Sequence, residues 1–155
     1  MRALMLVALA AACLGAALLN PISWRFQDAP SRAVRPGARF TVKLVAEIEK
    51  GWHLYSMRPL EDGPIPTRIW ISEGQQFQLA GPVAAPRPQA VHDPNFDMEV
   101  EFYDGSAAFV VPVRAAPNAT VGVQKLQVSV SYQSCNDKLC LPPRTVRVDI
   151  PVEIR

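Results

Sequence analysis

The segment ARFTVKLVAEIE (residues 38–49) alternates apolar and polar side chains along most of its length. Its apolar positions fall on every second residue, at Phe40, Val42, Leu44, Ala46 and Ile48. Because successive side chains of a β-strand point to opposite faces, this pattern predicts a strand with one buried face. Such a strand needs a second layer of structure to cover that face.

Segments with similar patterns recur towards the C-terminus, at residues 52–56, 67–72, 76–80, 100–103, 106–113, 125–133 and 145–154. Many of the 15 prolines lie between these segments, where a missing N–H ends a strand without breaking a sheet ladder. Beyond the N-terminus, no segment of helical length shows a 3.6-residue pattern. We therefore predict an all-β fold, an immunoglobulin-like antiparallel β-sandwich, with a closed barrel as the alternative.

The N-terminus has the features of an export signal, because Arg2 precedes an uncharged apolar run over residues 3–19. Gly15 and Ala17 are spaced for cleavage, which predicts a signal peptide at residues 1–17. An uncleaved membrane anchor is the alternative, since the run just reaches the ~17 residues that span a bilayer. A lipid anchor on Cys13 is less favoured, because Ala10 stands where lipoprotein signals usually carry a larger aliphatic side chain.

The remainder divides into a linker at residues 18–35 and one domain at residues 36–155. A length of 155 residues fits a single domain, and a net charge of +2 does not indicate a nucleic-acid partner. The long stretch at residues 81–97 carries no strand pattern and is expected to be irregular.

Cys135 ends one alternating segment and Cys140 begins the next, with Asn136 and Asp137 as turn-forming residues between them. If Cys13 leaves with the signal, these two cysteines remain as a pair in a compartment where disulfides persist. Opposite positions in a hairpin place Cβ atoms ~4.5–5.5 Å apart, more than the ~3.8 Å usual in a disulfide. A bridge at that spacing should be strained and easier to reduce, although spacing alone favours a structural staple across the turn.

The string YQSCNDKLCLPP (residues 132–143) resembles the cysteine hairpin of the N-terminal periplasmic domain of the bacterial thiol:disulfide interchange protein DsbD, an immunoglobulin-like domain. GWHLYS (51–56) is similar to that family's Gly-aromatic-x-Leu-Tyr segment, and EVEFYDGSAAF (99–109) to its Glu-Phe-Tyr cap loop. The resemblance covers residues 35–155. Val100 departs from it, since family members often carry an acidic residue there, and the loop between the cysteines is one residue shorter than in some members.

The resemblance implies a role for each matching residue. Cys140 would form the mixed disulfide with partner proteins, and Cys135 would resolve it. Phe102 would be the cap that shields the pair, with an ordinary core position as the alternative. The other site-lining residues implied are Tyr103, Glu101 and Tyr55.

The function implied is an electron relay in the periplasm, carried out by a module of the protein-disulfide reductase type. Electrons would come from a membrane donor in a separate protein and pass to exported thioredoxin-fold partners, either disulfide isomerases or proteins of cytochrome c maturation. No cofactor, metal or nucleic acid is expected.

Two alternatives remain. One is a non-catalytic binding module with a structural disulfide that contacts partners through residues 81–97. The other is a periplasmic copper(I) site formed by Cys135 and Cys140 with Met57, Met98 or His53.

Overall fold

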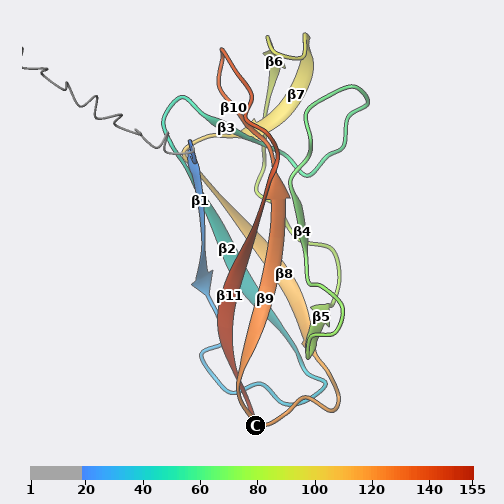
Figure 1. Cartoon of the computed structure of the whole chain (residues 1–155). Coiled ribbons are helices and arrows are strands. Elements are labelled where there is room, and N and C mark those ends of the chain that lie inside the picture. Colours follow the sequence, from blue (N-terminus) through green and yellow to red (C-terminus); the bar gives the residue numbers. More distant parts are fainter. Residues whose placement is uncertain (1–18) are drawn as a thin grey trace, which may run out of the picture.

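The computed structural model describes residues 19–155, and every regular element within them is a β-strand (Figure 1). No helix in this part of the chain has the length and apolar character needed to cross a membrane. The signal peptide predicted at residues 1–17 lies outside the described residues.

The strands form three antiparallel sheets. The first has the order β1-β2-β8-β5, with bounds Ile22–Asp28, Arg39–Ile48, Ser106–Ala115 and Phe77–Leu79. The second has the order β11-β9-β4, with bounds Arg144–Ile154, Gly122–Tyr132 and Arg68–Trp70. The third and smaller sheet has the order β10-β3-β7-β6, with bounds Ser134–Cys135, His53–Tyr55, Met98–Tyr103 and Gln89–Asp93.

The first two sheets pack face to face around one apolar core. Along β8 the side chains of Ala107, Phe109, Val111 and Val113 are buried, and the residues between them are more exposed. Strands β9 and β11 contribute alternate residues to the same cluster. The period-two pattern therefore buries one face of each sheet, and the predicted antiparallel β-sandwich is confirmed.

The chain enters the sandwich earlier than predicted. Strand β1 lies within residues 18–35, which were predicted as a linker, and pairs with β2. Ile22 is fully buried and Trp24 packs against the core, so residues 22–28 are part of the sandwich and the linker prediction is wrong for them. Strand β6 likewise lies inside the stretch predicted to be irregular. It is held by pairing with β7 along all five of its residues.

The small sheet stands at one end of the sandwich, at the top in Figure 1. Strand β7 continues into β8 through a tight turn in which Gly105 has a positive φ of 63°, a conformation that glycine adopts without strain. Leu54 of β3 and Tyr103 of β7 are paired in register and extend into the main core. The small sheet is thereby fixed to the sandwich and provides a separate face at its end.

Candidate functional site

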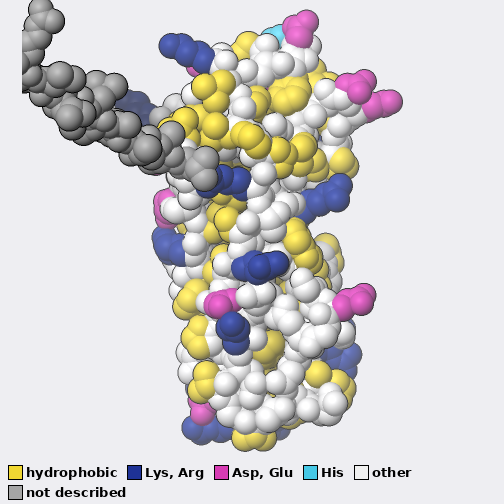
Figure 2. Space-filling model, in the orientation of Figure 1, with side chains coloured by type: hydrophobic (Ala, Val, Ile, Leu, Met, Phe, Trp, Pro, Cys, Tyr) yellow, Lys and Arg dark blue, Asp and Glu magenta, His cyan; other side chains and the backbone are white. Residues whose placement is uncertain are grey.

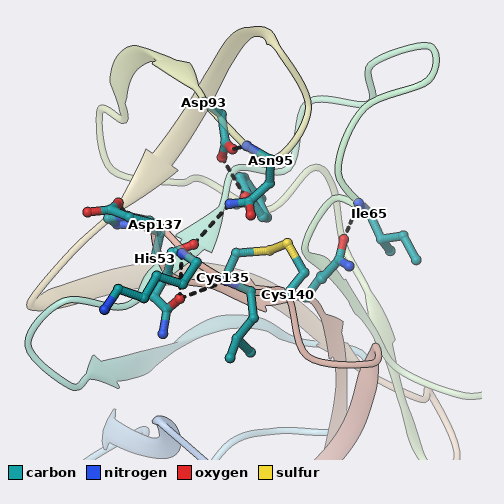
Figure 3. Close-up of a disulfide and its surroundings, with 12 residues drawn as sticks. His53, Ile65, Asp93, Asn95, Cys135, Asp137 and Cys140 are labelled. Carbon is teal, nitrogen blue, oxygen red and sulfur yellow. Dashed lines mark hydrogen bonds and ion pairs between the residues drawn. A yellow bond between two sulfur atoms is a disulfide. The ribbon is translucent and has the colours of Figure 1, made fainter.

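The two cysteines form a disulfide at the end of the small sheet (Figure 3). Cys135 is the last residue of β10, and Cys140 lies opposite it as an antiparallel bridge, with 4.1 Å between the Cα atoms. The pair predicted from the sequence is therefore present as a bridge across a hairpin. We call residues 134–141 the cysteine hairpin.

Asn136 organises the turn between the cysteines. Its side-chain oxygen accepts hydrogen bonds from the backbone N–H groups of Lys138 and Leu139, each at 2.9 Å. Its own N–H donates to the carbonyl of Leu139, also at 2.9 Å. This is the turn chemistry expected of asparagine, which competes well for nearby backbone donors. The side chain thus holds the two cysteines opposite each other.

The two sulfur-bearing residues differ in burial. Cys135 is 0% exposed, whereas Cys140 is only partly buried. Leu139, beside Cys140, is 42% exposed. A second protein approaching this end would therefore meet Cys140 first, at a surface that carries apolar side chains (Figure 2).

The disulfide is covered by its own apolar cluster, separate from the main core. Buried Tyr55, Val100, Phe102 and Cys135 form this cluster. Partly buried side chains pack around it, namely Leu60, Val91, Phe96, Met98 and Cys140. We call this set the cysteine cluster. The structure therefore brings Phe102 and Tyr55 together with the cysteines, as the resemblance implied.

The other two residues implied to line the site lie on the opposite face of the same sheet. Phe102 pairs with Tyr55 in register, so these two side chains share a face, and Glu101 and Tyr103 alternate to the other one. Tyr103 packs in the main core, and its ring meets that of Phe109 edge-on at 5.6 Å. Burial raises the pKa of this phenol.

Glu101 is engaged away from the disulfide as well. Its carboxylate accepts hydrogen bonds from Arg58 at 3.1 Å and from the Ser56 hydroxyl at 3.3 Å. Alternate residues of a strand lie on opposite faces, so the sequence of β7 already indicates that Glu101 and Tyr103 face away from Phe102.

A polar chain that was not predicted links β6 to the cysteine hairpin. The Tyr55 hydroxyl donates to the buried Asp93 carboxylate at 2.6 Å, and the Asn95 N–H donates to the other oxygen at 2.8 Å. The Asn95 side chain then donates to the carbonyl of Asn136 at 2.9 Å (Figure 3). Burial and the Asp93 carboxylate together raise the pKa of Tyr55 far above its usual range.

This chain of hydrogen bonds ties the tip of the β6–β7 hairpin to the turn between the cysteines. At the tip, the ring of Phe96 meets that of Tyr55 edge-on, with 5.9 Å between the centroids. The tip, residues 94–97, therefore closes over the cysteine cluster from the side opposite β10.

His53 is the cross-strand neighbour of Cys135. Its ring stacks on that of Phe102, with 4.2 Å between the centroids and a tilt of 33°. Its Nε2 lies 3.4 Å from an oxygen of Asp137, and its Nδ1 is buried without a hydrogen-bond partner. From the sequence, His53 was expected only as a ligand of the alternative copper(I) site.

Within residues 19–155, no group of three or more histidine, cysteine, aspartate or glutamate side chains is arranged to hold a metal ion. Of the two methionines considered as additional ligands, Met98 packs against the cysteine cluster and Met57 against the main core.

The fold and this site define a class of protein: a β-sandwich that carries a partly shielded disulfide at one end. The family model described as "Thiol:disulfide interchange protein DsbD, N-terminal" matches residues 25–151, so the chain belongs to this family. A comparison with curated proteins found no match.

Among solved structures, the reduced N-terminal domain of DsbD from Neisseria meningitidis has a TM-score of 0.51 and 18% identity, over 72% of this chain and 77% of that chain. This likeness confirms the immunoglobulin-like sandwich. Two further structures have lower scores. A family 123 glycoside hydrolase from Clostridium perfringens has a TM-score of 0.35 and 8% identity, over 86% of this chain and 27% of that one. The fimbrial subunit MyfA from Yersinia enterocolitica has a TM-score of 0.34 and 12% identity, over 84% and 98%.

Proposed function

We propose that this chain is a periplasmic thiol-disulfide exchange domain whose Cys135 and Cys140 alternate between dithiol and disulfide. The observation that supports the proposal most directly is the unequal burial of the two cysteines, 0% exposure for Cys135 against partial exposure for Cys140. Thiol-disulfide exchange requires that a sulfur of another protein can reach one of the two cysteine sulfurs along the axis of the S–S bond. A purely structural disulfide requires no such access. Membership of the DsbD N-terminal family supports the same chemistry.

In the reducing direction, the thiolate of Cys140 attacks one sulfur of a partner's disulfide and expels the partner's other sulfur as a thiolate. Cys135 then attacks the sulfur of Cys140 and releases the partner's second thiolate. One disulfide forms in this chain and one breaks in the partner, so two electrons and two protons leave the dithiol. The proposed reaction uses side chains alone.

The partners we propose are exported proteins of the thioredoxin fold, such as disulfide isomerases and proteins of cytochrome c maturation. A membrane electron donor would reduce the domain again. Exposed Leu139 next to Cys140, and Ile65, which is also 42% exposed, offer apolar contact area of the kind that protein interfaces use. The Ile65 N–H donates to the side chain of Gln133, close to the cysteine hairpin (Figure 3).

Phe102 is proposed to restrict exchange to such partners. A thiolate is consumed by small oxidants wherever they reach it, so an apolar side chain packed with Cys135 protects the reduced form. Docking of a partner would displace the cover and open the disulfide. A domain without this cover would lose electrons to any oxidant in an oxidising compartment.

A redox titration tests the proposal. The protein is equilibrated in glutathione buffers of graded potential, quenched with acid, alkylated, and its reduced fraction is determined by mass spectrometry. We expect a midpoint above about −300 mV, because structural disulfides of exported proteins lie below that value. A bridge that stays oxidised throughout the glutathione range would overturn the relay and favour the structural staple.

A further inference from the structure

Resolution of the mixed disulfide requires that Cys135 lose its proton, because the thiolate is the nucleophile. Cys135 is 0% exposed and packs among Tyr55, Val100 and Phe102. Apolar burial disfavours the charged thiolate, and bulk water has no direct access to take the proton. A base close to Cys135 would remove this obstacle.

His53 stands beside Cys135 in the sheet. Strands β3 and β10 pair these two residues in register, so their side chains leave the same face of the small sheet (Figure 3). Directly opposed residues of antiparallel strands have Cβ atoms ~4.5–5.5 Å apart, within reach of an imidazole ring and a thiol. The ring is further fixed by its stacking on Phe102, at 4.2 Å between the centroids.

The two ring nitrogens have different surroundings. Nε2 faces an oxygen of Asp137 at 3.4 Å, and a carboxylate there favours the tautomer that carries its proton on Nε2. Nδ1 is buried and has no hydrogen-bond partner, although buried polar atoms are normally paired. In that tautomer, Nδ1 holds a free lone pair inside the site while Nε2 points to Asp137, whose side chain is 85% exposed.

We infer that His53 takes the proton of Cys135 during resolution, an inference that rests on the proposed exchange function. The proton moves from the Cys135 sulfur to the imidazole, the Cys135–Cys140 bond forms, and the bond between Cys140 and the partner breaks. The partner leaves as a thiolate, and the proton passes from His53 to solvent on the Asp137 side. When a donor reduces the disulfide, the protonated imidazole returns a proton to the Cys135 thiolate.

Few other ionisable groups share this environment. The cysteine hairpin contributes Cys140, Asp137 and the exposed Lys138, β3 itself contributes Tyr55, and β6 contributes Asp93. Tyr55 and Asp93 are hydrogen-bonded to each other, and burial and Asp93 keep the phenol neutral by raising its pKa. Phe102 of β7 contacts the ring without charge.

A two-phase reaction with the aromatic disulfide 5,5′-dithiobis(2-nitrobenzoate) isolates the resolving step. The reduced protein releases one nitrothiobenzoate when the Cys140 thiolate attacks the reagent, and a second when Cys135 attacks the resulting mixed disulfide. Both releases are followed by absorbance in stopped flow. H53Q keeps a polar side chain that cannot take a proton. H92Q is the matched control, because His92 is exposed and also lies beside an aspartate, with 3.0 Å to Asp97.

We expect H53Q to slow the second phase on the order of 10²-fold at neutral pH, as loss of a general base does, and to change the first phase less than twofold. The wild-type second phase should already be fast at neutral pH, as expected of a step assisted by a base beside the thiol. In H53Q it should quicken only at the higher pH where the buried thiol ionises unaided. H92Q should match the wild type in both phases.

H53A provides an independent test, because added imidazole should restore much of its second-phase rate and leave H92Q unaffected. A side chain needed only for packing would not be replaced in this way. If H53Q matches the wild-type rates and pH profile, or imidazole leaves H53A unchanged, the role of His53 is overturned while the relay stands. If the wild type itself shows no second release, the proposed exchange function fails first.

Discussion

Phe102 and Cys135 lie on one face of the small sheet and pack in the same apolar cluster, apart from the main core of the sandwich. Phe102 is 7% exposed and in contact with the ring of His53. Phe102 is therefore buried outside the main core, in a cluster that contains a cysteine of the disulfide. Removing the side chain should change access to sulfur more than it changes the stability of the fold.

Phe102→Ala is expected to speed alkylation of the reduced cysteines by iodoacetamide severalfold, because it uncovers the buried sulfur. Its cost in the free energy of unfolding should stay near the ~1.5–3 kcal/mol of lost apolar burial. The small cluster at the end of the molecule can close around the gap. Alkylation kinetics and urea denaturation measure the two effects on the same samples.

Phe109→Ala is the matched control, since Phe109 is fully buried in the main core. Its ring contacts that of Tyr103, which lies on the face of the small sheet away from Phe102. This substitution should cost the ~3–5 kcal/mol typical of a core Phe→Ala change and leave the alkylation rate of the native protein unchanged. If Phe102→Ala behaved like this control in both measurements, Phe102 would be a core residue and the shielding role would be wrong.

Asn95→Ala should loosen the tip of the β6–β7 hairpin, because it removes the hydrogen bond to the Asn136 carbonyl. The side chain is exposed, so the loss in stability should be at most ~1 kcal/mol. Reduction of the disulfide by dithiothreitol should nevertheless become faster, as closure over the cysteine cluster weakens. Amide hydrogen exchange at residues 95–97 reports on the local opening.

Asn118→Ala is the control for this change. Asn118 is exposed in the turn between β8 and β9, at the opposite end of the sandwich (Figure 1). The Asn118→Ala substitution should change neither the rate at which dithiothreitol reduces the disulfide nor amide hydrogen exchange at residues 95–97. Equal rates of reduction in the two variants would mean that the link between Asn95 and the cysteine hairpin does not control access.

Stability should fall at alkaline pH through the buried tyrosines. Burial is the leading cause that raises the pKa of Tyr55, Tyr103 and Tyr132, so the unfolded chain loses phenolic protons near pH 10 while the folded chain keeps them. Because the pKa of each phenol is higher in the folded than in the unfolded state, the stabilisation from the buried tyrosines is complete below about pH 10. It is lost progressively as the pH rises above that value. Above pH 10, each of these tyrosines lowers the free energy of unfolding by up to ~1.4 kcal/mol per pH unit.

Tyr55→Phe should reduce this alkaline slope, although it also removes the hydrogen bond to Asp93. Urea denaturation between pH 8 and 11 gives the slope, and phenolate absorbance of the native protein shows whether the rings ionise. Phenolate absorbance rising in the folded protein near pH 10 would contradict the prediction.

The cysteine pairing was predictable because it depends on a short-range pattern. Alternating segments placed Cys135 and Cys140 at two strand ends, and Asn136 supplied the turn between them. The same alternation puts Glu101 and Tyr103 on the face away from Phe102, a consequence that the resemblance to the family did not convey.

The link through Asp93 and Asn95 could not be predicted in this way. These residues reach the site because β6 pairs with β7 and folds its tip towards the cysteine hairpin, across a long separation in sequence. Strand β6 carries little alternation of its own and is formed by its partner strand. A pattern read along one segment contains no information about such a contact.

The two cysteines are expected to have different roles, and their difference in burial gives the reason. Cys140 is partly exposed, while Cys135 is fully buried, so a docking partner would meet Cys140 first. Cys135→Ser should therefore accumulate a mixed disulfide through Cys140, because the resolving thiol is absent and the partner cannot be released. Cys140→Ser should trap little, since no partner sulfur can approach Cys135 in line.

Each variant would be expressed in the exporting compartment, alkylated at once and separated on a non-reducing gel, with trapped partners identified by mass. The double variant is the control for association that involves no sulfur. Equal trapping by the two single variants would show that partners reach the buried sulfur as readily as the exposed one, so the assigned roles would be wrong while exchange itself stood. If neither variant trapped a partner and the wild-type bridge resisted glutathione, burial of Cys135 would serve only to protect a structural crosslink, and the unequal exposure of the two cysteines would have no part in chemistry.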